Sequence, residues 1–145
     1  MFNEILIVCI GNICRSPTGE YLFKQKLTNK PNVKVHSAGV GALVDHPIDE
    51  TAGQLLLENG IDAGDHKARQ LSTQMLVDAD LILTMDNSLI KSINSLAPQV
   101  SGKIFLLSKW SSGAAIGDPY RKSREAFEHV YKKIDSFTND WLKYL

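Results

Sequence analysis

The segment EILIVCIGNICRSP, residues 4–17, is the most informative part of this 145-residue chain for predicting its architecture. It opens with a continuous apolar run over residues 4–10, rich in branched side chains, which predicts a strand buried on both faces of a parallel sheet. After a short loop, Ser16 and Pro17 are expected to be the N-cap and the first residue of a helix that runs to about Asn29. A strand, a loop and a helix are therefore expected in succession near the start of the chain.

The rest of the chain continues this alternation of strands and helices. Further strands are expected over residues 33–37, 81–85 and 103–107, and further helices over residues 48–59, 71–78 and 87–96. Gly60 should follow the first of these helices and Asp86 should cap the last. A final helix is marked by apolar residues at spacings of three and four, namely Phe127, Val130, Tyr131, Ile134, Phe137 and Trp141. The pattern predicts one α/β domain over residues 1–145, with a central four-stranded parallel sheet flanked by helices on both sides.

The bulk composition narrows the possible partners and compartments. Lys and Arg together number 16, as do Asp and Glu, so no overall charge draws the protein to nucleic acid. No apolar run approaches the roughly 20 residues that span a bilayer, and the N-terminus lacks the features of a signal peptide. With only two cysteines, Cys9 and Cys14, the sequence is not a secreted disulfide framework. We therefore expect a cytoplasmic protein with no nucleic-acid partner and no membrane insertion. A monomer is also expected.

The loop at residues 9–16 lies where α/β proteins bind ligands, beyond the carboxyl end of a strand and before a helix N-terminus. Backbone N–H groups that wrap around an oxyanion there form an anion-binding nest, aided by the helix dipole. The loop lacks the Gly-Lys-Ser/Thr ending of a nucleoside-triphosphate site. It offers instead a thiol at Cys9 and a guanidinium six positions later, at Arg15. These features predict a phosphate site beside a nucleophile.

Cys9 and Arg15 together predict the transfer of a phosphoryl group to sulfur. The cationic loop would favour the reactive thiolate form of Cys9, and Arg15 could grip two phosphate oxygens with its planar fork. The expected reaction is in-line attack by Cys9 on phosphorus, followed by hydrolysis of a phosphocysteine intermediate. Ser16 is the natural hydroxyl to stabilise Cys9 as a leaving group. Asp118, in the long loop after the fourth strand, is the candidate acid that protonates the leaving oxygen.

Several of these residues also have simpler structural interpretations. Alone, Cys9 is typical of a small core residue, Arg15 of a surface charge and Asp118 of an Asp-Pro turn. Cys14 is either a buried packing residue or a resolving thiol that protects oxidised Cys9 as a disulfide. Residues 121–124 are expected to form a solvated basic patch next to Asp118. No metal or other cofactor is expected, because the four histidines lack a second ligand at metal spacing: His36, His46, His66 and His129.

The sequence resembles the low-molecular-weight protein tyrosine phosphatases along essentially its whole length. The motifs that carry the resemblance are VCIGNICRSP at residues 8–17, HSAGV at 36–40, HKARQL at 66–71, DADLILTM at 78–85 and DPYRKSREAF at 118–127. The first block combined with a downstream Asp-Pro pair is highly specific, and the other blocks support it.

The resemblance implies a role for each matching residue. Cys9 would be the nucleophile, Arg15 the phosphate clamp and Asp118 the general acid. Asn12 would hold the loop in shape, braced by Ser37 and His66, while Ser16 would stabilise the thiolate. Phosphate would be bound mainly through backbone N–H groups, by Ile10, Gly11, Asn12, Ile13, Cys14, Arg15 and Ser16. The slot for the tyrosine ring would be lined by Ile13, Leu43 and Tyr120, and Cys14 matches a redox cysteine of the family.

Two positions depart from vertebrate-type members of this family. Those proteins carry an aromatic residue near the position of Leu43 and a second tyrosine at the position of Arg121. The combination found here is similar to bacterial members that act on autophosphorylating tyrosine kinases of capsule or exopolysaccharide export. The resemblance therefore implies such a kinase as the phosphotyrosine partner.

Four other functions share some of these sequence features. Arsenate reductases share the loop but use further cysteines downstream, and this chain has none after Cys14. Protein arginine phosphatases of this family carry threonine where this chain has Ile13. A non-catalytic phosphotyrosine-binding module would need neither Cys9 nor Asp118, and a thiol-redox protein favours C-x-x-C spacing over the C-x4-C spacing found here.

Overall fold

The computed structural model describes residues 2–145 and contains a four-stranded parallel sheet in the order β2-β1-β3-β4. The strands are β1 (Glu4–Cys9), β2 (Lys34–Gly39), β3 (Leu81–Thr84) and β4 (Ile104–Leu106). The helices are α1 (Arg15–Lys26), α2 (Glu50–Glu58), α3 (Thr73–Asp78), α4 (Asn87–Leu96) and α5 (Arg124–Trp141), with 3-10 turns at Pro98–Lys103 and Leu142–Tyr144. The predicted α/β architecture is therefore confirmed.

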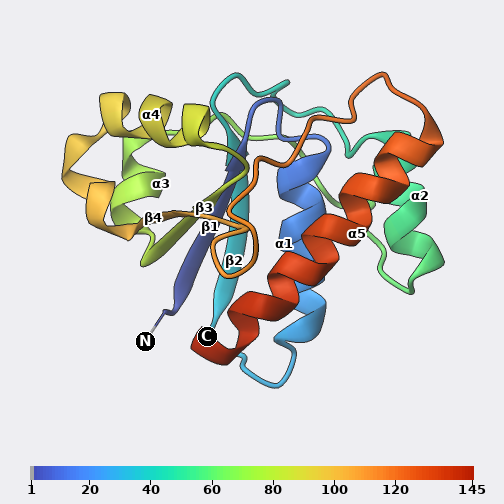
Figure 1. Ribbon diagram of the computed structural model, residues 1–145, viewed down its shortest axis with the longest axis horizontal. Helices are drawn as coiled ribbons and strands as arrows, with labels where there is room; N and C mark the ends of the chain where they lie inside the picture. Colours follow the sequence, from blue (N-terminus) through green and yellow to red (C-terminus); the bar gives the residue numbers. More distant parts are fainter. Residues whose placement is uncertain (1) are drawn as a thin grey trace.

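Helices cover both faces of the sheet, with α1, α2 and α5 on one side and α3 and α4 on the other (Figure 1). The side chains of β1 alternate between the two resulting cores. Ile5 and Ile7 face the α1 and α5 side, where Phe23 is also fully buried. Leu6 and Val8 face the opposite core, which is closed by α3 and α4. Because both faces of β1 are covered, its sequence is a continuous apolar run rather than an alternating one.

The start of α1 differs from the prediction. The helix begins at Arg15 after Cys14 and has no side-chain cap, so Ser16 is not its N-cap and Pro17 is its third residue. The hydroxyl of Ser16 is occupied elsewhere, by Cys9 and Asn12. The helix also ends at Lys26, three residues before the predicted end. The prediction of Ser16 as N-cap was wrong because its hydroxyl contacts Cys9 and Asn12 instead of a backbone N–H in the first turn of α1.

Other boundaries follow the predictions more closely. The α4 bounds agree, and the Asp86 carboxylate accepts a hydrogen bond from the Leu89 N–H at 2.9 Å. Gly60 follows α2 with a φ of 81°, as expected for a glycine after a helix C-terminus. The β2 strand continues to Gly39, where a Cβ atom would lie 2.2 Å from the Ile10 carbonyl oxygen. Only glycine lets β2 pass this close to the loop after β1.

No helix within residues 2–145 is both long and apolar enough to cross a membrane.

Candidate active site

The loop that joins β1 to α1 points its carbonyl groups away from its centre. Each carbonyl from Cys9 to Cys14 accepts a hydrogen bond from surrounding structure, the donors being Val40, Gly41, Leu43, His66, Asp49 and Thr18 in that order. Over residues 2–145, the N–H groups of residues 10–14 donate to no protein acceptor. A loop whose carbonyls are bonded outward and whose N–H groups stay free is a nest for an anion.

Asn12 holds this loop in a conformation that few residues adopt. Its φ is 59°, in the left-handed region that asparagine tolerates better than most side chains. The fully buried Asn12 amide donates to the Ser16 Oγ at 2.8 Å and the Ser37 Oγ at 2.9 Å. Its Oδ1 accepts from the backbone N–H of Arg69 at 2.8 Å. These bonds offset the cost of the strained backbone, so the predicted role of Asn12 has a geometric basis.

His66 and Ser37 contact Asn12 in different ways. The His66 Nε2 lies 2.7 Å from the Asn12 carbonyl oxygen, so it carries a proton and donates to the backbone rather than to the side chain. The Ser37 hydroxyl accepts from Asn12 and donates to the Glu20 carboxylate at 2.5 Å. Glu20 was missed by the sequence analysis because a glutamate inside a helix is ordinarily a surface residue.

Cys9 and Ser16 lie side by side beneath the loop. The Sγ of Cys9 is 2.8 Å from the Oγ of Ser16, and both residues are buried. Because the Ser16 oxygen accepts from the Asn12 amide, its own hydrogen is free to be donated to a Cys9 thiolate. A donated hydrogen bond of this kind stabilises negative charge on the sulfur.

Arg15 is a buried cation held in place by the loop that carries Asp118. Its side chain is 3% exposed, and its Nη1 donates to the Ile116 carbonyl at 2.8 Å. Its Nη2 lies 3.8 Å from the Asp118 Oδ2, while the Asp118 side chain is 42% exposed. The structure therefore brings the predicted clamp and the predicted acid together, although they are 103 positions apart in the sequence.

Cys14 lies in an apolar cluster with Ile13, Leu55 and Phe127. Burial, followed by the nearby carboxylates of Asp49 and Asp118, raises the pKa of the Cys14 thiol far above its ordinary value. The thiol is therefore protonated at neutral pH, and both cysteines are free of disulfide bonds.

A cavity of about 180 Å³ opens over the loop, and all the residues predicted to line the substrate slot lie in its wall. Its lining consists of Cys9, Ile10, Gly11, Asn12, Ile13, Cys14, Arg15, Gly41, Leu43, Asp118 and Tyr120. Ile13 is almost fully buried, whereas Ile10, Leu43 and Tyr120 each expose more than a third of their surface. The side chain of Ile10 therefore joins the predicted slot residues as an exposed apolar wall. Across residues 2–145, no three His, Cys, Asp or Glu side chains gather in a way that could hold a metal ion.

Comparisons with known proteins place this geometry in a family. The family described as "Low molecular weight phosphotyrosine protein phosphatase" matches residues 4–145. The tyrosine phosphatase Etp of Escherichia coli K12 is 46% identical over 144 residues, which cover 99% of this chain and 95% of Etp. The crystal structure of the Erwinia amylovora tyrosine phosphatase AmsI has a TM-score of 0.94 at 46% identity and covers 100% of this chain and 94% of that one.

A second solved structure carries a ligand. Vibrio vulnificus Wzb in complex with benzylphosphonate has a TM-score of 0.94 at 40% identity, and the match covers all of both chains. The family match and the near-complete coverage of these relatives agree with each other and with the geometry of the loop. The chain therefore belongs to the low molecular weight phosphotyrosine protein phosphatases.

Proposed function

We propose that this protein-tyrosine phosphatase works through a phosphocysteine intermediate, with Cys9 as nucleophile, Arg15 as clamp and Asp118 as general acid. The observation that carries the proposal is the loop of free N–H groups, with the Cys9 sulfur 2.8 Å from a serine hydroxyl at its base. Such a loop holds the three terminal oxygens of a phosphate monoester. It thereby presents the phosphorus to the sulfur beneath it.

The first step transfers the phosphoryl group from substrate to enzyme. The Cys9 thiolate attacks phosphorus in line with the tyrosine oxygen, the P–S bond forms and the P–O bond to tyrosine breaks. Asp118 gives its proton to the leaving phenolate oxygen, so tyrosine departs neutral. Arg15, already anchored on the Ile116 carbonyl, neutralises charge on the transferring group. A phosphate in the cradle would replace Asp118 as the partner of Arg15 and free that carboxyl group to turn toward the leaving oxygen.

The second step returns the enzyme to its starting state. Water attacks phosphorus, Asp118 accepts the proton that the water loses, and the P–S bond breaks with the electron pair going to sulfur. The hydrogen bond from Ser16 stabilises the departing thiolate of Cys9. Inorganic phosphate then leaves the loop, and no metal or other cofactor takes part in either step.

The slot supports an aromatic substrate. Ile10, Leu43 and Tyr120 offer exposed apolar surface above the loop, which can pack on both faces of a phenyl ring. The relative from Vibrio vulnificus binds benzylphosphonate, a phenyl ring joined to a phosphonate through one carbon. Phosphoserine would leave this apolar surface uncovered, and phosphoarginine would place a polar guanidine against it.

The proposed physiological substrate is an autophosphorylating tyrosine kinase of capsule or exopolysaccharide export, encountered in the cytoplasm. Leu43 and Arg121 make the rim less aromatic than in vertebrate-type members, which supports this assignment. The Arg121 guanidinium lies 5.2 Å from the centre of the ring of Tyr120, which lines the slot. A cation there favours phosphotyrosines with acidic or further phosphorylated neighbours.

A panel of peptides tests the activity. We expect rapid turnover of a phosphotyrosine peptide, little turnover of matched phosphoserine and phosphoarginine peptides, and complete loss of turnover in Cys9→Ser. Retained binding of tungstate by Cys9→Ser would show that the variant is folded. Turnover of the phosphoarginine peptide at an equal or higher rate would replace the proposal with an arginine phosphatase.

A further inference from the structure

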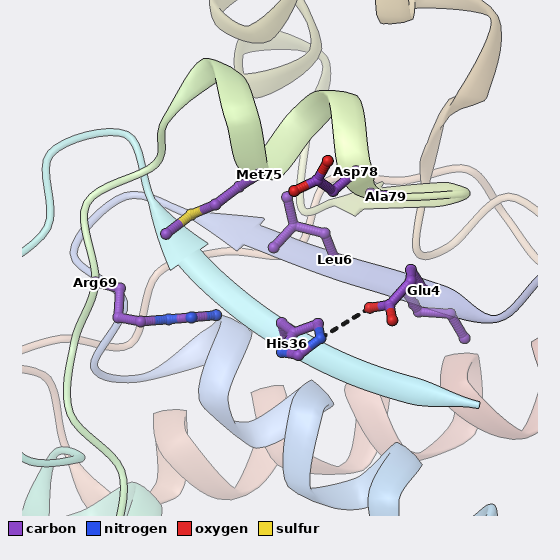
Figure 2. A pocket seen from close by; sticks show the side chains of 8 residues that line it. Glu4, Leu6, His36, Arg69, Met75, Asp78 and Ala79 are labelled. Carbon is purple, nitrogen blue, oxygen red and sulfur yellow. Dashed lines mark hydrogen bonds and ion pairs between the residues drawn. The ribbon is translucent and has the colours of Figure 1, made fainter. Parts of the chain in front are cut away.

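A cavity of about 380 Å³ lies away from the loop, roughly twice the volume of the 180 Å³ slot. It opens between α3 and the strands β1 and β2, on the face of the sheet opposite to α1 (Figure 2). Its lining residues are Glu4, Ile5, Leu6, His36, Arg69, Met75, Asp78 and Ala79. None of these residues belongs to the proposed catalytic set, so the function of the slot leaves this cavity unexplained.

The charged side chains divide the cavity into two ends. Figure 2 shows the guanidinium of Arg69 reaching in from one side and the carboxylates of Glu4 and Asp78 lying on the other. Apolar groups separate them, with Leu6 at the floor and Met75 above it. The cavity therefore offers a cation, an apolar middle and two anions in sequence.

Hydrogen-bonding capacity remains at both ends. The Nε and Nη2 atoms of Arg69 share one acceptor, the Ser37 carbonyl, at 3.4 and 3.2 Å, and its Nη1 has no acceptor among residues 2–145. Asp78 accepts from the Gln74 amide at 2.7 Å but pairs with no cation in the described part of the chain.

We propose that this cavity binds a small zwitterion with an apolar body. The anionic group of the ligand faces Arg69, and its ammonium group faces Glu4 and Asp78. Each end of the ligand meets protein charge of the opposite sign, and its carbon chain covers Leu6 and Met75. The His36 Nε2 lies 2.9 Å from the Glu4 Oε2, and this contact orients the Glu4 carboxylate at one wall of the cavity.

Arg69 also connects the cavity to the phosphate-binding loop. Its backbone N–H donates to the Asn12 Oδ1, and its guanidinium donates to the carbonyl of Ser37, whose hydroxyl accepts from Asn12. A ligand that pulls on the Arg69 side chain therefore acts on the residue that holds the loop in shape. Zwitterion binding should change the affinity of the loop for oxyanions, a consequence that rests on the proposed function of the loop.

The binding test uses 6-aminohexanoate as the probe and amide chemical shifts of the isotope-labelled protein as the readout. We expect saturable shifts at Leu6, His36, Met75 and Asp78, and at least tenfold weaker binding of hexanoate and hexylammonium, which each carry only one charge. A double variant, Glu4→Gln with Asp78→Asn, should weaken binding at least tenfold. The matched control Asp140→Asn removes a carboxylate from the last turn of α5 and should bind like wild type.

Three results would overturn the site: shifts confined to residues 9–16, equal binding of the singly charged probes, or unchanged binding by the double variant.

Coupling between the cavity and the phosphate-binding loop is measured separately, from tungstate affinity with and without saturating 6-aminohexanoate. We expect at least a threefold change, and the same factor when the order of addition is reversed, because coupling is reciprocal. Binding without any change in tungstate affinity would overturn the coupling. Failure of phosphotyrosine hydrolysis would leave the chemical-shift result standing, so the two proposals fail separately.

Discussion

The two loops that meet at the site are built in opposite ways. The loop after β1 is buried from Asn12 to Cys14, and every carbonyl from Cys9 to Cys14 is hydrogen-bonded to surrounding structure. The segment that carries Asp118 lies in a long connection without helix or strand, and the Asp118 side chain is 42% exposed. Its polar contacts with the start of α1 are a hydrogen bond from Arg15 to the Ile116 carbonyl and a long ion pair between Arg15 and Asp118.

This difference matches the two tasks that we assign to the loops. A cradle for the phosphoryl group works best when its donors are fixed before the substrate arrives. A proton donor must instead approach the leaving oxygen after binding and withdraw to release product, which suits a segment with few buried contacts. The comparison predicts that changes in the buried loop affect stability and anion binding, whereas changes at Asp118 affect the chemical step alone.

After loss of the Cys9 nucleophile, the largest effect is expected from Asp118→Asn. The change keeps the acceptor for the Tyr120 N–H, at 3.1 Å, but removes the proton that the leaving oxygen needs. We expect kcat/KM for a phosphotyrosine peptide to fall about 10²–10⁴-fold. For 4-nitrophenyl phosphate, whose leaving group needs no proton, kcat/KM should fall far less. Equal losses on both substrates would show that Asp118 is not the acid, and an unchanged melting temperature is the control.

Substitutions of Asn12 separate the backbone strain of the buried loop from its hydrogen bonds. Both Asn12→Gly and Asn12→Ala lose the side-chain bonds to Ser16, Ser37 and Arg69, which should cost about 1–3 kcal/mol of unfolding free energy. Asn12→Ala should lose roughly 1 kcal/mol more, because alanine tolerates a φ of 59° poorly and glycine tolerates it well.

Denaturant unfolding and tungstate binding measure these two effects. Tungstate affinity should fall in both Asn12 variants, since the cradle loses its support. Wild-type stability in Asn12→Gly would mean that the side-chain bonds contribute nothing and that only the conformation matters.

Substituting Cys14 tests whether this buried residue only packs in the apolar cluster or also protects Cys9 from irreversible oxidation. Burial and the carboxylates of Asp49 and Asp118 raise the pKa of its thiol, so peroxide should oxidise Cys9 first. The resulting sulfenic acid would then be attacked by Cys14, forming a disulfide and releasing water. Wild type should regain most activity with dithiothreitol, whereas Cys14→Ala should recover several-fold less. Equal recovery would leave Cys14 as a packing residue only.

The smallest effect is expected at the opposite end of the sheet, at Asp80. Hydrogen bonds from the N–H groups of Asn3 and Glu4, each at 2.9 Å, lower the pKa of this carboxyl group. Because the folded pKa lies below the unfolded one, the stabilisation is complete above the unfolded value of about 3.9 and disappears as pH falls through the folded value.

Thermal unfolding as a function of pH tests this contribution. Asp80→Asn should lower the melting temperature at pH 7 by at most about 4 °C, and the difference from wild type should shrink below about pH 4. Activity at pH 7 should be unchanged, because Asp80 lies far from both loops. A difference that grows on acidification would contradict the sign of the pKa shift.

The sequence alone predicts the parts of this molecule that depend on neighbouring residues. The run of apolar residues in β1, the periodic α5 and the Asp86 cap were all predicted, because each depends on local spacing. The role of Ser16 as a cap was wrong because Cys9 and Asn12 engage its hydroxyl. Glu20 and Arg69 were missed because their contacts with Ser37 and Asn12 cross the fold.

The cavity beneath α3 could not be predicted from the sequence either, because its charged residues come from segments that are distant in the chain. Glu4, Asp78 and Arg69 lie in three separate segments, and each is ordinary as a charged surface residue in its own segment. Only the packing of α3 beside β1 and β2 places them around one space. The proposed catalytic residues are easier to identify from sequence, because Cys9 and Arg15 lie close together in one short segment and the family motifs indicate Asp118.

The most direct test of the account is to trap the enzyme between its two steps. Asp118→Asn should react with 4-nitrophenyl phosphate but then hydrolyse the intermediate slowly, because it lacks the base that activates water. Acid quench followed by digestion and mass spectrometry should locate a phosphoryl group on Cys9, accompanied by a burst of one 4-nitrophenolate per enzyme. A burst with the phosphoryl group on another residue, or steady turnover with no modified residue, would contradict the assignment of Cys9 as the nucleophile.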